Sequence, residues 1–107
     1  MFGVVKIGDH EIEMLANGAT PYRYKTVFHE DYLAKVTGNI SDAEATDMMA
    51  KMGYIMAMQA EKADMTKLSM DTFIEWLEQF APNDIYAATS AISDIYAGNA
   101  GTDVSPK

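Results

Sequence analysis

Residues 41–62 have the sequence SDAEATDMMAKMGYIMAMQAEK, which carries the longest helical pattern of the chain. Ser41 is followed three residues later by Glu44, a capping box that marks a helix N-terminus. Asp47 and Lys51 are four residues apart, in the favourable orientation for a helical ion pair. One face of the predicted helix then carries residues at intervals of three and four: Met48, Met52, Ile55, Met56 and Gln59. The segment predicts one long helix with a methionine-rich buried face.

The N-terminus has the pattern of a β-hairpin. Residues 2–7 are the β-rich run FGVVKI, Gly8-Asp9-His10 is turn chemistry, and residues 11–15 alternate polar and apolar through Met14. A lone hairpin is only marginally stable in water. Its apolar face must therefore pack on the helices or on another subunit.

A helix is expected between the hairpin and residue 41. Thr20-Pro21 opens it, because Thr can cap a helix and Pro fits the first helical position. The pattern breaks near residues 29–31, restarts, and ends before Gly38.

Two further helices are expected after residue 62. Ser69 caps the first, which places Phe73, Trp76, Leu77 and Phe80 on one face and stops at Pro82. Asn83 caps the second, which directs Ile85, Ala88, Ile92 and Ile95 inward and ends at Gly98.

Together these patterns predict an α+β fold that is mostly α, with an N-terminal β-hairpin packed on four to five helices. Residues 1–97 form a single domain, and residues 98–107 form a flexible C-terminal tail. The predicted core anchors are Phe28, Met52, Ile55, Phe73, Trp76, Phe80 and Ile92.

Composition narrows the classes of partner. The chain has 107 residues, no Cys and a formal net charge of −8. Residues 41–107 carry four basic side chains against eleven acidic ones, so they would repel a phosphate backbone, and nucleic-acid binding is not expected. The most apolar long segment, residues 43–60, contains Glu44, Asp47 and Lys51, so a membrane span is not expected either.

No residue set indicates an active site. His10 and His29, the only histidines, lack the spacing of a metal-ligand pair. The carboxylate pairs Glu11/Glu13, Glu30/Asp31 and Glu75/Glu78 have the placement of solvated surface groups. We therefore expect no enzyme activity, no metal and no cofactor.

Methionine and tyrosine are the candidates for a contact surface. Residues 48–58 contain five methionines, too many for one narrow buried face. They favour either a helix buried on several sides or an adaptable surface for a partner, since Met packs irregular surfaces. Tyr is also enriched at interfaces. The candidate partner-binding residues are Met49, Met58, Tyr22, Tyr54 and Tyr86.

Two segments carry a resemblance to a known family. Residues 4–14, VVKIGDHEIEM, resemble the short Lys-Ile-Gly-Asp-x-Glu opening hairpin of tail assembly chaperones from long-tailed phages of Gram-positive bacteria. Residues 19–28, ATPYRYKTVF, are similar to the Thr-Pro-x-Arg-Tyr-Lys-x-x-Phe segment that often follows there. The sequence resemblance covers about the first 36 residues; beyond them only the architecture, helices followed by a loose tail, agrees.

The resemblance implies a non-enzymatic assembly protein. Members of this family bind the tape measure protein and other tail proteins in the host cytoplasm, tend to self-associate, and are usually absent from the mature virion. Two other classes of protein stay open. One is an acidic inhibitor that mimics nucleic acid and blocks a DNA-binding protein, and the other is an enzyme or ligand-binding domain with a deep polar pocket.

Overall fold

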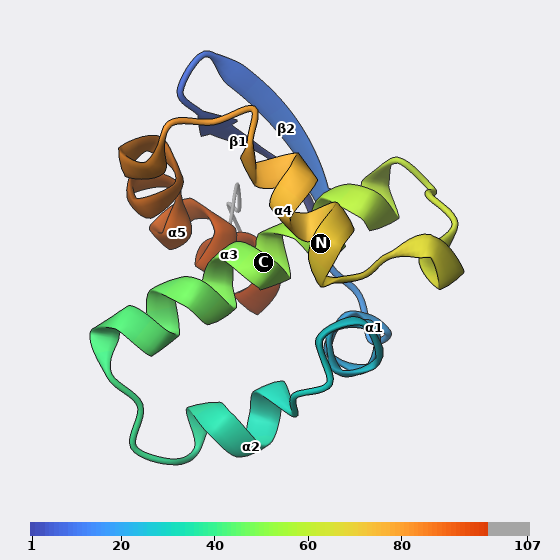
Figure 1. Cartoon of the computed structure of the whole chain (residues 1–107), viewed down its shortest axis with the longest axis vertical. Coiled ribbons are helices and arrows are strands. Elements are labelled where there is room, and N and C mark those ends of the chain that lie inside the picture. Colours follow the sequence, from blue (N-terminus) through green and yellow to red (C-terminus); the bar gives the residue numbers. More distant parts are fainter. Residues whose placement is uncertain (99–107) are drawn as a thin grey trace, which may run out of the picture.

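Helix α3 (Asp42–Ala60) runs through the middle of the fold and contacts the hairpin, α1, α4 and α5 (Figure 1). The structure is a computed structural model that describes residues 1–98. The predicted capping box is confirmed at the start of α3. The Ser41 hydroxyl accepts a hydrogen bond from the Glu44 N–H at 3.1 Å, and the Glu44 carboxylate accepts one from the Ser41 N–H at 3.2 Å.

Helix α3 is enclosed by its neighbours over two turns. Every residue from 50 to 57 is buried, and so are all members of the predicted stripe from Met48 to Gln59. The methionine-rich face is therefore confirmed as core. Burial on several sides also explains why the apolar residues of this helix are too numerous for one narrow stripe.

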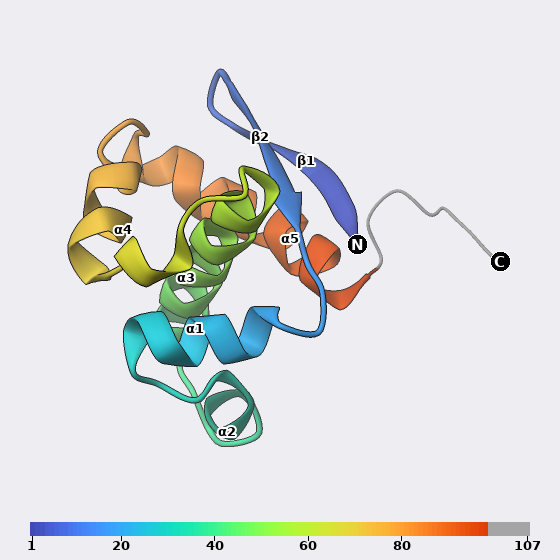
Figure 2. The same cartoon turned by 90° about the vertical axis from the view of Figure 1, so that its right-hand side faces the viewer.

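The N-terminal hairpin covers one side of α3 and α5. Strands β1 (Phe2–Ile7) and β2 (His10–Leu15) pair antiparallel, with Val5 opposite Ile12. Gly8 has φ +61°, which glycine adopts without strain in the turn. Val5, Ile7 and Met14 point inward and are at most 1% exposed. Strand β2 lies on α3 and β1 lies on α5, so the hairpin is held by helices on its apolar face (Figure 2).

Helices α1 (Thr20–Phe28) and α2 (Tyr32–Val36) follow the hairpin, and the predicted break between them is confirmed. His29 ends α1 in the left-handed region at φ 58°. The predicted cap at Thr20 is wrong, because Thr20 lies inside the helix and its hydroxyl is fully buried. That hydroxyl accepts instead from the Gln59 side chain at 2.8 Å, which supplies a buried donor.

Helix α4 (Met70–Leu77) and helix α5 (Pro82–Ala97) complete the fold after a short 3-10 turn at Met65–Lys67. Ser69 caps α4 as predicted. The predicted cap of α5 at Asn83 is wrong: the chain enters the helix at Ala81, and Pro82 occupies the first turn, where its missing N–H costs nothing. Gly98 ends α5 at φ 80° as predicted.

Within residues 1–98, the observed order of a two-stranded hairpin followed by five α-helices confirms the predicted α+β class with its excess of helix. Apart from Gly98, the predicted tail over 98–107 lies outside the described residues.

The core differs from the prediction at α4, and the helix ends at Leu77, so the predicted continuation through Phe80 to Pro82 is wrong. Phe28, Met52, Ile55, Phe73 and Ile92 are buried as expected. In contrast, Trp76 and Phe80 are only partly buried and pack against the edge of the core. Phe73 occupies the inward position of α4, whereas Trp76 lies against the Tyr54 ring at 5.5 Å and the Phe80 ring at 5.1 Å. Trp76 therefore packs over the edge of the core and is not one of its fully buried residues.

Replacing Phe73 with Ala should lower the free energy of unfolding by about 3–5 kcal/mol, because it leaves a cavity in a buried site. Replacing Trp76 with Ala should cost less, because solvent already reaches that side chain. Urea unfolding followed by circular dichroism measures both. A larger loss for the tryptophan variant would contradict the placement of Phe73 as the inward residue.

Gly53 sets the approach of α3 to α5. A Cβ at this position would lie 2.8 Å from the Ile92 Cδ1. Replacing Gly53 with Leu should therefore destabilise the fold by about 1–3 kcal/mol through overpacking, despite the better helix propensity of Leu. Replacing Ala45, an exposed position of the same helix, with Leu is the matched control and should leave the urea midpoint nearly unchanged. Equal midpoints for the two variants would refute the tight contact.

Candidate functional site

An apolar groove lies between the first half of α3, helix α4 and the start of α5. Its volume is about 560 Å³. Three of its large side chains are exposed: Met70 at 44%, Ile74 at 46% and Tyr86 at 59%. The other groove-lining residues are Ala43, Thr46, Asp47, Ala50, Lys51, Phe73, Leu77 and Ile85.

Helical spacing of apolar residues on α4 builds one wall of the groove. Met70, Phe73, Ile74 and Leu77 recur at intervals of three and four residues, so they share one face of the helix. Phe73 turns to the core while Met70 and Ile74 stay exposed. The stripe of α4 is thus wider than the surface that the fold covers, and the uncovered part forms the groove.

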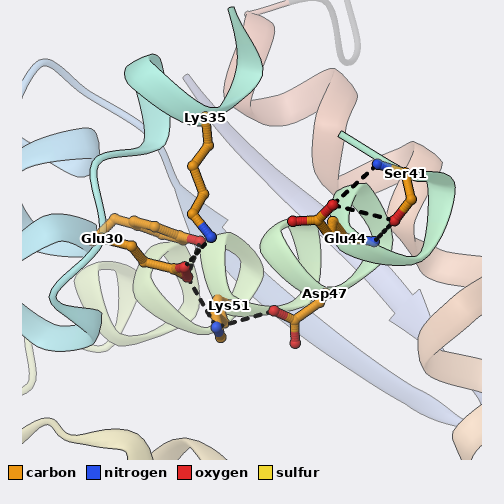
Figure 3. Close-up of polar contacts among 7 residues, drawn as sticks. Glu30, Lys35, Ser41, Glu44, Asp47 and Lys51 are labelled. Carbon is orange, nitrogen blue, oxygen red and sulfur yellow. Dashed lines mark hydrogen bonds and ion pairs between the residues drawn. The ribbon is translucent and has the colours of Figure 1, made fainter. Parts of the chain in front are cut away.

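A polar cluster borders this groove on the α3 side. The Lys51 ammonium lies 2.9 Å from the Glu30 carboxylate and 3.0 Å from the Asp47 carboxylate (Figure 3). The Lys35 ammonium reaches the other Glu30 oxygen at 3.1 Å. Tyr24 donates its hydroxyl to Glu30 at 2.8 Å. The cluster therefore ties the α1–α2 connection to the middle of α3.

The cluster shifts the pKa of its members. Burial raises the pKa of the Glu30 carboxyl, but hydrogen bonds from Lys51, Tyr24 and Lys35 outweigh burial and lower this pKa to about 2. Burial lowers the pKa of Lys51, but the bonds to Glu30 and Asp47 outweigh it and raise this pKa. Burial, and then the bond to Glu30, raise the pKa of Tyr24. Glu30 and Lys51 therefore stay charged at neutral pH, and Glu30 is a poor general base.

Four of the five predicted contact residues reach the surface, in different places. Tyr86 lines the groove. Met49 is half-buried and lines a shallow hollow with Thr89 and Ser93, which shares Thr46 with the groove. Tyr22 is 73% exposed on α1, and Met58 is half-buried near the other end of α3. Only Tyr86 and Met49 therefore lie at or beside the groove.

Tyr54 is the exception, because the fold buries it. It is 2% exposed, its ring lies 5.6 Å from that of Phe73, and its hydroxyl donates to Thr72 at 2.7 Å. Helix α4 covers this side of α3. The tyrosine therefore joins two elements of the same chain and offers no surface to a partner.

The other candidates for chemistry are dispersed. The His10 ring lies edge-on to that of Phe80 at 5.1 Å, and His29 is the exposed residue that ends α1. Glu11, Glu13, Glu75 and Glu78 are exposed. Among residues 1–98, no three His, Asp or Glu side chains gather closely enough to hold a metal ion.

Sequence reasoning missed the partnership of Glu30 with Lys51. One signal was available, because a Lys inside a run that is buried on several sides needs a counter-charge. The helical spacing predicts only the pair with Asp47, four residues away. Glu30 is 21 residues away, and no spacing rule connects the two positions.

No known protein family, curated protein or solved structure matches this chain. Within residues 1–98, no helix combines the length and the apolar character that crossing a membrane requires. The groove and the polar cluster beside it are the features of the described residues that bear on function.

Acid should weaken the fold through Glu30. A carboxyl whose pKa falls from 4.5 to about 2 on folding contributes roughly 3 kcal/mol of stability above pH 4.5, which is lost as the pH falls towards 2. The difference in unfolding free energy between the parent and Glu30→Gln should therefore shrink by about 2–3 kcal/mol from pH 6 to pH 2. Urea titrations measure it, with the exposed Glu75→Gln as control. A difference that is constant with pH would exclude the ion cluster.

Proposed function

We propose that this chain is a tail assembly chaperone of a long-tailed phage or prophage, which binds the tape measure protein during tail morphogenesis and self-associates. The observation that carries the proposal is the exposed apolar groove between α3, α4 and α5. The resemblance of residues 4–14 and 19–28 to that family supports it independently.

The groove has the form that recognition of a helix requires. Helices are bound by laying their apolar stripe into a groove lined by apolar side chains. A tape measure protein is long and helical, and its apolar stripes would aggregate if left bare. A small acidic protein that covers such a stripe would keep the complex in solution, because net charge opposes association.

Self-association has a separate candidate surface on the outer face of the hairpin. Phe2 and Val4 point away from the core and are 53% and 54% exposed. Residues of α3 contribute less than the sequence suggested, since the helix is enclosed over residues 50–57. We therefore place a contact between copies at the hairpin and keep the groove for the partner.

The proposed setting is the cytoplasm of the host bacterium, and the chain is not expected in the mature virion. The partners are the tape measure protein and other tail proteins, and the proposal includes no enzyme activity, no cofactor and no nucleic-acid binding.

Co-expression with the tape measure protein of the same phage or prophage genome tests the proposal. We expect the tape measure protein to be insoluble when expressed alone, and to move to the soluble fraction and co-purify with this chain. Phe73→Ala, which weakens the fold, should reduce the recovery. A tape measure protein that stays insoluble beside a folded partner would overturn the proposal.

The nucleic-acid mimic is the second candidate, favoured by the absence of Lys and Arg from α4 and α5. It predicts that the chain displaces DNA from a DNA-binding protein of the same host. Displacement together with failure to retain the tape measure protein would decide for the mimic.

A further inference from the structure

We infer that the groove between α3, α4 and α5 takes an amphipathic helix whose apolar stripe is flanked by Lys or Arg. This inference rests on the proposed function, since it names the segment of the partner that this chain would bind. The shape of the groove, the paired backbone of its walls and its charge all favour this occupant.

The groove excludes an extended peptide by its construction. Its walls are side chains of three helices, whose backbone groups are already paired within each helix. An extended segment laid there would bury N–H and C=O groups without partners, which costs free energy. A helix satisfies its own backbone and presents only side chains, so a helical occupant is the one that suits these walls.

The size of the exposed surface sets the length of the contact. Met70 and Ile74 are one turn apart on α4, and Tyr86 stands across the groove on α5. Helix α4 has 8 residues, which corresponds to about 12 Å at 1.5 Å per residue. Two to three turns of a partner helix, roughly ten residues, would fill this span.

Acidic residues line the solvent edge of the α4 wall. Asp71 follows Met70, Glu75 follows Ile74, and Glu78 follows the groove-lining Leu77 by one position. Because a helix turns about 100° per residue, these three carboxylates form a row beside the apolar stripe. All three are exposed. A partner helix lying in the groove would bring one of its flanks against this row.

Among residues 1–98, no free cation on the groove walls offsets these acids. Helices α4 and α5 contain no Lys or Arg. Lys51 on the α3 wall is already bound by Glu30 and Asp47 at 2.9 and 3.0 Å. The α4 and α5 walls therefore carry a net negative charge. A helix with acidic flanks would be repelled there, and a helix with basic flanks would be attracted.

Two synthetic helices and a charge reversal test the inference on the full chain. The peptides share one Leu stripe, and their flanking positions are all Lys in one and all Glu in the other. Fluorescence anisotropy of the labelled peptides measures binding. We expect the Lys peptide to bind at least about tenfold tighter, and its affinity to fall about tenfold between 50 and 500 mM salt.

The control separates the groove from overall charge. The double substitution Glu75→Lys and Glu78→Lys reverses two charges beside the groove. It should abolish or invert the preference for the Lys peptide. The double substitution Asp9→Lys and Glu61→Lys changes the net charge equally, but at exposed residues outside the groove, and should preserve the preference. If both pairs act alike, the preference reflects net charge alone and the inference is wrong.

The substitution Ile74→Ser tests the apolar contact. It should weaken binding of the Lys peptide by about tenfold. Leu33→Ser, at a site on α2 that is 60% exposed and outside the groove, should not. Because both positions are exposed, thermal melts should show that both variants are folded. Tyr86→Ser is a second variant of the groove. Equal effects of Ile74→Ser and Leu33→Ser, or no binding of either peptide, would overturn the inference.

The outcomes also separate this inference from the proposed function. If the tape measure protein is retained equally well by the parent and by Ile74→Ser, the chaperone proposal holds and the groove is not its binding site. If the Lys peptide binds in the groove but the tape measure protein stays insoluble, the groove inference holds and the chaperone proposal fails.

Discussion

The whole fold depends on a single requirement, which is that helix α3 must be surrounded. Its residues from 50 to 57 are all buried, and most of them are apolar. A helix that is apolar on nearly every side cannot be stable in water by itself. The hairpin, α1, α4 and α5 each cover one part of it. The hairpin and these three helices can therefore be understood as the cover of α3, while α2 packs on α1.

Two polar side chains of α3 determine where the neighbouring elements pack on it. Gln59 donates to the Leu15 carbonyl and to the Thr20 hydroxyl, at 2.6 and 2.8 Å, and so joins the end of the hairpin to the start of α1. Lys51 joins the α1–α2 connection through Glu30. A buried polar group without a partner is costly, so each of these contacts penalises alternative placements of α1. Burial of apolar side chains stabilises the packing of the other elements on α3. Gln59 and Lys51 determine where α1 lies along it.

Local signals in the sequence predict the helices and strands well. They do not predict which residues of different elements lie close together in the fold. The capping box at Ser41 and the methionine spacing located α3, because both are contained within one helix. The misplaced cap at Thr20 and the burial of Tyr54 came from tertiary contacts that the local pattern does not encode. The cap at Asn83 was misplaced because Pro82 already opens α5. The sequence also could not predict the groove. Its prediction requires knowing that Met70 and Ile74 on α4 and Tyr86 on α5 line the same groove. The sequence pattern also predicts Glu30 as a surface residue, because its partner Lys51 is remote in the chain.

Helix α4 is held to the rest of the molecule by few anchors. Phe73 is its only buried residue, while Trp76 and Leu77 are half-buried and its remaining apolar side chains lie in the open groove. Local opening requires the least free energy where buried apolar contacts are sparsest. The wall of the groove is thus the element that fluctuates most easily away from α3. A binding surface with one compliant wall can adjust its width, and so a single small protein could accommodate successive helical segments of different bulk along one long partner.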